Sequence, residues 1–123
     1  MSHRNGLVVV DHGSRWPGAQ AHLGELVATL RTMRPDDLVA GAHLEFSPPT
    51  VPEAIDEIVA QGARQVLVLP YLLLHGRHSR ADLPRFATEA QARHPGVVVT
   101  VGPPVGVSEV VLQVLLDAAK AVP

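Results

Sequence analysis

Short runs of apolar residues alternate along this chain with segments in which apolar residues recur at helical spacing. The third run is nearly continuous, which is typical of a strand that is covered on both faces of a sheet. Pro70 lies within it and cannot donate a hydrogen bond to a neighbouring strand, so the regular part of this strand should end near Pro70. The pattern therefore predicts strands within Leu7–Val10, Val39–Phe46, Gln65–Leu74 and Val97–Val101.

The segments between the runs predict helices. Thr50 and Glu53 stand at the spacing of a capping box, which predicts the start of the second helix, and Gly62 suits its end. The first helix is predicted from helical spacing alone, because its apolar residues are Leu23, Leu26, Val27, Leu30 and Met33.

Two further helices are expected in the second half of the chain. Asp82 is expected to cap the third helix, with Pro84 tolerated in its first turn and His94–Gly96 ending it. Ser108 is expected to cap the fourth helix, which is strongly apolar.

Strands that alternate with helices at this spacing predict right-handed crossovers and a parallel sheet. We therefore expect an α/β fold, a three-layer sandwich in which a four-stranded parallel sheet carries helices on both faces. A chain of 123 residues is long enough for one core, so a single domain over residues 1–123 is expected.

Composition removes several classes of function. The chain has no cysteine, which excludes disulfides, thiolate metal sites and thiol catalysis. A formal net charge of -2 argues against a general nucleic-acid binder. The first apolar run is too short for a signal peptide or a membrane span, so a cytoplasmic location without a membrane partner is expected.

Three side chains with metal-binding chemistry follow three successive predicted strands. His12, Glu45 and His78 lie at equal intervals along the chain, each about one strand and one crossover apart. Ligands of parallel α/β sheets bind beyond the carboxyl ends of the strands, so these residues should meet at one rim. Two imidazoles and a carboxylate suit a first-row divalent cation and leave coordination positions open for exchange.

Each of these residues also has a purely structural interpretation. His12 can cap the loop after its strand, Glu45 can pair with Arg15, and His78 can simply be exposed. His43 is expected to share a strand face with Glu45, either supporting the site or packing in the core.

Four segments, in this order, resemble the small CbiX-type sirohydrochlorin cobaltochelatases, a family of class II tetrapyrrole chelatases. Any one segment is weak evidence, but together they span almost the whole chain. The segments are Leu7–Arg15, Leu44–Ile55, Val68–His78 and Ala81–Pro84.

The resemblance implies a chelatase-like sandwich that inserts a divalent metal, first of all Co²⁺, into sirohydrochlorin during cobalamin biosynthesis. It implies that His12, Glu45 and His78 bind the metal and take part in catalysis, with no organic cofactor. Related chelatases insert Fe²⁺ or Ni²⁺, and the sequence does not separate these metals. Two residues depart from the family pattern: Asp11 replaces a residue that is often small, and His75 adds an imidazole near His78.

The chemistry of metal insertion fits these residue types. Two pyrrole protons must leave the macrocycle, and an imidazole of near-neutral pKa is a natural proton acceptor. Sirohydrochlorin carries many carboxylates, so its site needs cationic and hydrogen-bonding groups. The candidates near the proposed ligands are Ser14, Arg15, Ser47, Arg77 and Arg80.

A domain of this size would hold a large macrocycle poorly by itself, and longer relatives contain two such domains in tandem. A homodimer is therefore expected, with the apolar last helix, which includes Val110 and Leu115, supplying core and interface together.

Two other functions share features of this sequence. A His-Gly pair after the first strand is also found in histidine phosphatases, but Asp11 stands where those enzymes have an arginine, and its charge would oppose a phosphoryl group. A metal-delivery module would use the same His/Glu site without a tetrapyrrole.

Overall fold

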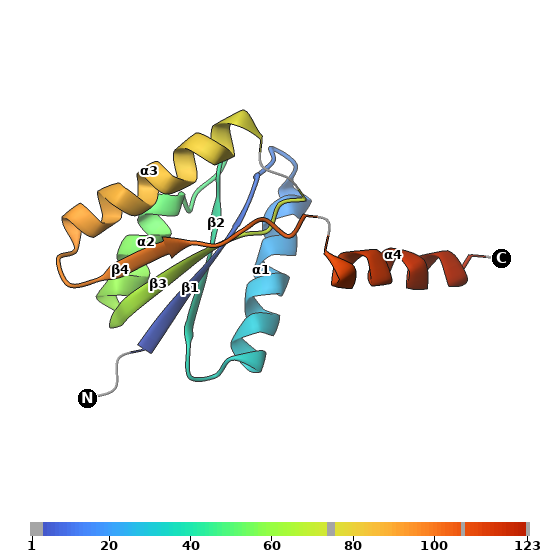
Figure 1. Cartoon of the computed structure of the whole chain (residues 1–123), viewed down its shortest axis with the longest axis horizontal. Helices are drawn as coiled ribbons and strands as arrows, with labels where there is room; N and C mark the ends of the chain where they lie inside the picture. The colour runs from blue at the N-terminus through green and yellow to red at the C-terminus, as the bar shows by residue number, and fades with distance from the viewer. Residues whose placement is uncertain (1–3, 74–75, 107, 123) are drawn as a thin grey trace.

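A four-stranded parallel sheet organises the protein (Figure 1). The central strands are β1 (Arg4–Asp11) and β3 (Ala63–Pro70), and the outer strands are β2 (Leu38–His43) and β4 (Val98–Val101), in the order β2-β1-β3-β4. The computed structural model describes residues 4–73, 76–106 and 108–122, except for the side chain of His78. All three strand pairings are parallel, which confirms the predicted sheet.

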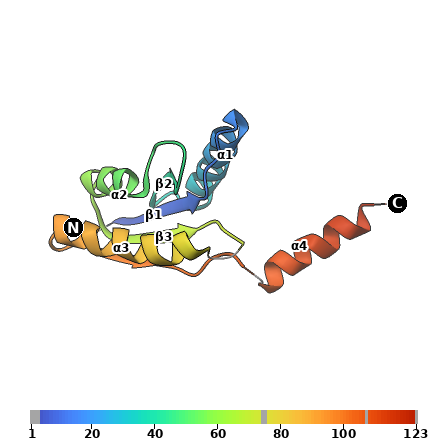
Figure 2. The ribbon, with the colours of Figure 1, turned by 90° about the horizontal axis from the view of Figure 1, so that it is seen from above.

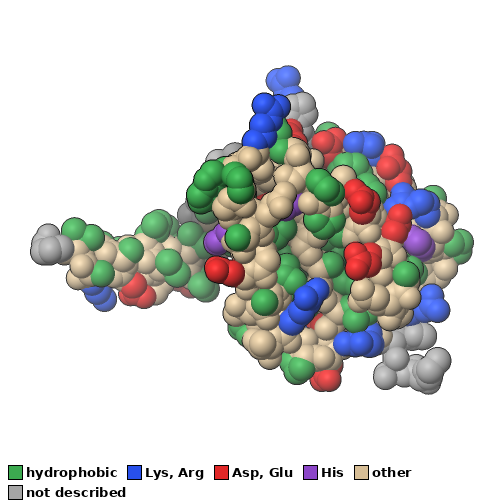
Figure 3. Space-filling view, turned by 180° about the vertical axis from the view of Figure 1, so that it is seen from behind, with side chains coloured by type: hydrophobic (Ala, Val, Ile, Leu, Met, Phe, Trp, Pro, Cys, Tyr) green, Lys and Arg blue, Asp and Glu red, His purple; other side chains and the backbone are tan. Residues whose placement is uncertain are grey.

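Four helices follow the strands in alternation, with the bounds α1 (Pro17–Met33), α2 (Val51–Ala60), α3 (Arg77–Arg93) and α4 (Glu109–Lys120). The first three pack against the sheet, whereas α4 projects away from it (Figures 1 and 2). None of the residues of α4 is buried, and hydrophobic side chains are exposed along this helix beside charged ones (Figure 3). The expectation that this helix supplies part of the core is therefore wrong for the described structure.

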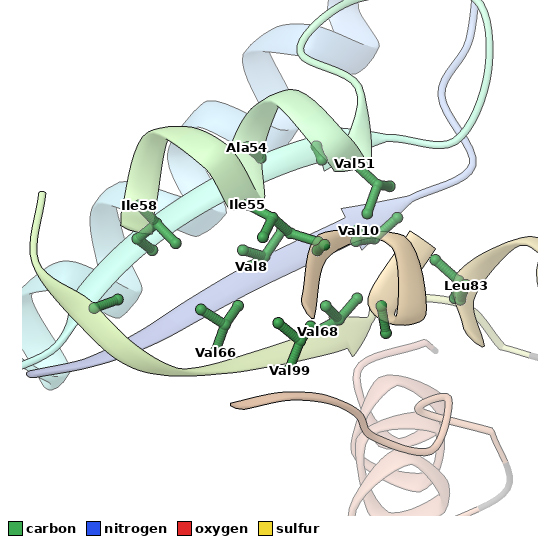
Figure 4. Packing of buried hydrophobic residues seen from close by; sticks show 14 of the residues in the cluster. Val8, Val10, Val51, Ala54, Ile55, Ile58, Val66, Val68, Leu83 and Val99 are labelled. Carbon is green, nitrogen blue, oxygen red and sulfur yellow. The ribbon is translucent and has the colours of Figure 1, made fainter. Parts of the chain in front are cut away.

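The larger part of the core lies between the sheet and the pair α2 and α3 (Figure 4). Side chains alternate between the two faces of a strand, so Val8 and Val10 of β1 point to the same side. They pack there with Ile55 and Ile58 of α2 and Leu83 of α3, all completely or almost completely buried.

The opposite face of the sheet carries α1. Leu7 and Val9 pack there against Leu23 and Val27 of that helix. Helices thus cover both faces, as predicted. The covering is incomplete at β4, because Val98 is 54% exposed.

The capping predictions are mostly confirmed. Thr50 and Glu53 form the reciprocal capping box of α2, and the side chain of Ser108 accepts a hydrogen bond from Val111 at the start of α4. Asp82 does not cap α3, because that helix begins earlier, with Gly76 as its N-cap and Pro84 inside it. The Arg80 amide already donates to the Gly76 carbonyl, so helical bonding is established before the proline.

Within the described residues, no helix combines the length and apolar character required to cross a membrane.

Ionic contacts join α2 to the end of α3. Asp56 accepts hydrogen bonds from Arg93 at 2.8 Å and pairs with the Nε2 atom of His94 at 2.7 Å. Burial raises the pKa of the Asp56 carboxyl, but the hydrogen bonds from His94 and Arg93 outweigh it, so the pKa lies below its ordinary value of 3.8.

We expect Asp56→Asn to reduce the dependence of stability on pH below about pH 4. A carboxyl whose pKa is lowered on folding stabilises the protein above its unfolded pKa, and this contribution is lost as the pH falls through the folded pKa. The side chain is 46% exposed, so the effect should stay below about 1 kcal/mol. Urea unfolding at pH 7 and pH 3 measures it; an identical pH dependence in both proteins would contradict the assignment.

Candidate metal site at the carboxyl ends of the strands

Backbone hydrogen bonds continue the pairing of β1 and β2 beyond the regular strands. The Leu44 amide donates to the Asp11 carbonyl, and the Glu45 amide donates to the His12 carbonyl, both at 3.0 Å. These bonds hold the loop that carries His12 beside the loop that carries Glu45. Two predicted ligands that lie far apart in sequence are therefore neighbours at one rim.

Gly13 allows this close approach. Its φ of +83° lies in the left-handed region, and a Cβ atom at this position would overlap the Glu45 carbonyl oxygen. The Gly13 amide also donates to Asp11 Oδ1 at 3.0 Å. The turn after β1 is therefore fixed by its close packing against Glu45 and by its hydrogen bond to the Asp11 side chain.

His12 and Glu45 are exposed and line a common hollow of about 190 Å³. The other side of the hollow is formed by the start of α3, including Gly76 and Arg77. An imidazole and a carboxylate facing one open hollow can bind a divalent cation without enclosing it. The described residues that line the hollow are His12, Leu44, Glu45, Gly76, Arg77, Ser79 and Asp82.

The third predicted ligand, His78, lies in the first turn of α3, one residue after Arg77. Its side chain lies outside the described part of the chain, as does the whole of His75. Among the residues that are described, no group of three or more His, Asp or Glu side chains is arranged to hold a metal. The proximity of His12 and Glu45 is thus observed, and the three-ligand site is a proposal.

The predicted substrate-binding residues are distributed around this rim. The guanidinium of Arg15 lies 5.1 Å from the centre of the Phe46 ring, and no ion pair joins Arg15 to Glu45 within the described residues. The Ser47 hydroxyl donates to the Ser14 carbonyl at 3.4 Å, which joins the first two loops. Arg80 is exposed on α3 but does not line the hollow.

One interaction near the site was not predicted from sequence. The Asp11 carboxylate pairs with the Nδ1 atom of His43 at 2.6 Å. Asp11 and His43 are register partners on β1 and β2, so only knowledge of the strand register reveals the contact.

The fold belongs to the class of chelatase-like α/β sandwiches. The chain superimposes with a TM-score of 0.87 on the sirohydrochlorin chelatase SirB from Bacillus subtilis subspecies spizizenii, solved in complex with cobalt. The two are 27% identical, and the match covers 97% of this chain and 51% of SirB. The model of the CbiX family matches residues 6–122, so the chain belongs to that family of class II tetrapyrrole chelatases.

Curated relatives carry names for two metals. The chain is 32% identical to the chloroplastic sirohydrochlorin ferrochelatase of Arabidopsis thaliana, over 92% of this chain and 50% of that protein. It is 27% identical to the sirohydrochlorin cobaltochelatase of Methanococcoides burtonii, over 99% of both. The chain therefore spans about half the length of the Arabidopsis protein and of SirB.

We expect Gly13→Ala to destabilise the protein by about 1–3 kcal/mol, because the new methyl group meets the Glu45 carbonyl on a backbone of positive φ. Gly24→Ala is the matched control, since its Cβ meets nothing within 4 Å. It lies inside α1 and should stabilise by up to about 1 kcal/mol. Urea unfolding compares them, and equal stability of the two variants would contradict the packing described here.

Proposed function

We propose that the protein is a metal chelatase that inserts a divalent cation into sirohydrochlorin, and that the cation is held by His12, Glu45 and His78. The proposal rests on one observation: His12 and Glu45 line the same hollow, and the start of α3 forms its opposite wall. His78 is one residue beyond the lining residue Arg77. The names of the relatives, sirohydrochlorin cobaltochelatase and ferrochelatase, support this substrate.

The cation is a substrate and must be released as readily as it is bound. Nitrogen and oxygen ligands on an open rim suit this requirement better than an enclosed thiolate site, and the chain has no cysteine. Glu45 offsets part of the charge of the cation. His12 and His78 present the metal and accept the two pyrrole protons that leave the macrocycle.

Co²⁺ is the proposed metal, with Ni²⁺ and Fe²⁺ as alternatives. Imidazole binds all three, so the ligand set does not choose among them. Of the relatives described above, one is named for cobalt and one for iron, which supports divalent metal insertion more strongly than it supports either metal.

The carboxylates of the macrocycle are proposed to meet the cationic and hydroxyl groups of the rim. Arg77 lines the hollow, and Arg15 stacks on Phe46 beside the second loop. Arg80, Ser14 and Ser47 complete the proposed set. A guanidinium binds a carboxylate with two parallel hydrogen bonds, which orients the substrate as well as attracting it.

We expect His12→Ala and His78→Ala to lower the rate of anaerobic sirohydrochlorin metallation by about 100-fold, because each removes a metal ligand and a proton acceptor. Glu45→Gln should lower it less, since an amide oxygen still binds the cation. Absorption spectroscopy with Co²⁺, Ni²⁺ and Fe²⁺ follows the reaction. His22→Ala, an exposed histidine on α1, is the control and should retain the wild-type rate.

Two results would contradict this function in different ways. Equal rates for wild type, the three variants and a reaction without protein would refute the chelatase. A protein that binds Co²⁺ but leaves the spectrum of sirohydrochlorin unchanged would be a delivery module.

We further propose that the protein acts as a homodimer. The helix α4 is amphipathic: Glu109, Gln113 and Asp117 form a polar stripe at i, i+4 spacing, whereas its apolar residues are exposed on the rest of its surface. An apolar helix face of this kind normally packs against another surface. An apolar hollow of about 440 Å³, lined in part by Tyr71 and Val114, lies beside this helix. Because the chain matches 51% of SirB, a second copy is the partner whose size fits.

The double variant Leu112→Glu/Leu116→Glu should be monomeric, near 13.1 kDa, where wild type sediments as a dimer. Both side chains are exposed within one copy, so the substitutions leave the fold intact but place two charges in the proposed apolar interface. Gln113→Glu is the control for charge on this helix. A wild-type protein that stays monomeric over a wide concentration range would refute the dimer.

A further inference from the structure

Asp11 and His43 form a nearly buried polar pair directly behind the candidate metal site. The side chain of His43 is 3% exposed and that of Asp11 is 16% exposed. A carboxylate and an imidazole in such surroundings are costly unless each finds a partner. They find each other: the Nδ1–H of His43 donates to Asp11 Oδ1 at 2.6 Å, a short hydrogen bond with an ionisable acceptor.

The pair is tied to the backbone of both loops that carry the proposed ligands. Asp11 Oδ1 also accepts the hydrogen bond of the Gly13 amide, so one carboxylate oxygen holds the residues on either side of His12. The His43 amide donates to the Pro49 carbonyl at 2.9 Å, which anchors the loop that contains Glu45. The pair therefore connects the turn after β1 with the loop after β2.

The Asp11–His43 pair and the candidate metal site lie on different sides of the rim. By strand alternation from Val9 and Val39, both of which pack with α1, Asp11 and His43 lie on the α1 side of the sheet. His12 instead lines the hollow that faces α3. The pair thus stands behind the site and has too little exposure to meet a substrate there.

We propose that Asp11 and His43 are positioning residues that set the geometry in which His12 and Glu45 hold the divalent cation. This inference rests on the proposed function. A cross-strand hydrogen bond that involves a carboxylate resists sliding of one loop past the other, so the two ligands keep a constant separation. Partners that orient metal ligands in this indirect way typically change metal affinity by about 10–100-fold when they are removed.

The test uses Co²⁺ alone as the probe and compares wild type with Asp11→Ala/His43→Phe. Replacing both partners by apolar groups leaves neither side chain of the pair without its partner. Only the amide of the half-buried Gly13 loses its acceptor, so the urea midpoint should fall only slightly below that of wild type. The Co²⁺ affinity should fall about tenfold or more, and the visible absorption of bound Co²⁺ should change, since it reports ligand geometry. Asp11→Asn keeps an acceptor for both donors and should lose less affinity.

The matched control is Asp56→Ala/His94→Phe, which deletes a similar His–carboxylate pair, with a separation of 2.7 Å, away from the rim. It should keep the wild-type Co²⁺ affinity and spectrum. If His12→Ala abolishes Co²⁺ binding but the Asp11/His43 double variant binds like wild type, the positioning role is refuted and the metal site stands. If wild type and His12→Ala bind Co²⁺ equally, the proposed metal site fails, and the positioning role fails with it.

Discussion

The close junction of β1 and β2 beyond their regular ends is the constraint on which the candidate site depends. Without the hydrogen bonds from Leu44 and Glu45 to the first loop, the two ligand-bearing segments would be independent loops on a sheet edge. Their separation would then fluctuate, and a cation would order both loops at an entropic cost. Gly13 makes the junction possible, because it adopts a positive φ and because a Cβ atom at this position would overlap the Glu45 carbonyl oxygen. The same backbone arrangement that completes the sheet therefore prepares the site.

Apolar residues of the sheet and of α4 differ in how far they are buried. The valines of β1 are buried by helices on both faces, and no residue of α4 contributes to that core. The apolar side chains of α4 have no such cover, since Val110, Val114 and Leu115 are all more than half exposed. Apolar surface of this extent normally marks an interaction site. The exposed apolar surface of α4, which one copy of the chain leaves uncovered, is thus the feature on which the proposed homodimer rests.

Much of the fold follows from local sequence signals, and the errors have identifiable physical causes. The apolar runs, the Thr50–Glu53 capping box and Pro70 each act over a few residues, so they predict α2 and the four strands, although β2 ends at His43 and not at the predicted Phe46. The start of α3 was misplaced because a capping aspartate followed by a proline is a common start signal, whereas this helix tolerates Pro84 in its interior. The meeting of His12 and Glu45 was predictable from the rule for parallel sheets. The Asp11–His43 pair was not, since it depends on strand register, and a shift of one residue would separate the two side chains.

The proposed function, in which the cation is a substrate, places two demands on the candidate site. The affinity of the site for the cation must be low enough for the cation to be transferred. This requirement favours few protein ligands, an exposed site and open coordination positions on the metal. Selective transfer requires those few ligands to be held in one arrangement, because each ångström of misplacement is costly at the moment of reaction. The exposed side chains of His12 and Glu45 meet the first demand, and the backbone hydrogen bonds between their two loops meet the second. In the proposed site, exposed side chains would allow the cation to be released, while the backbone beneath them would keep those side chains in one arrangement. The two requirements therefore do not conflict.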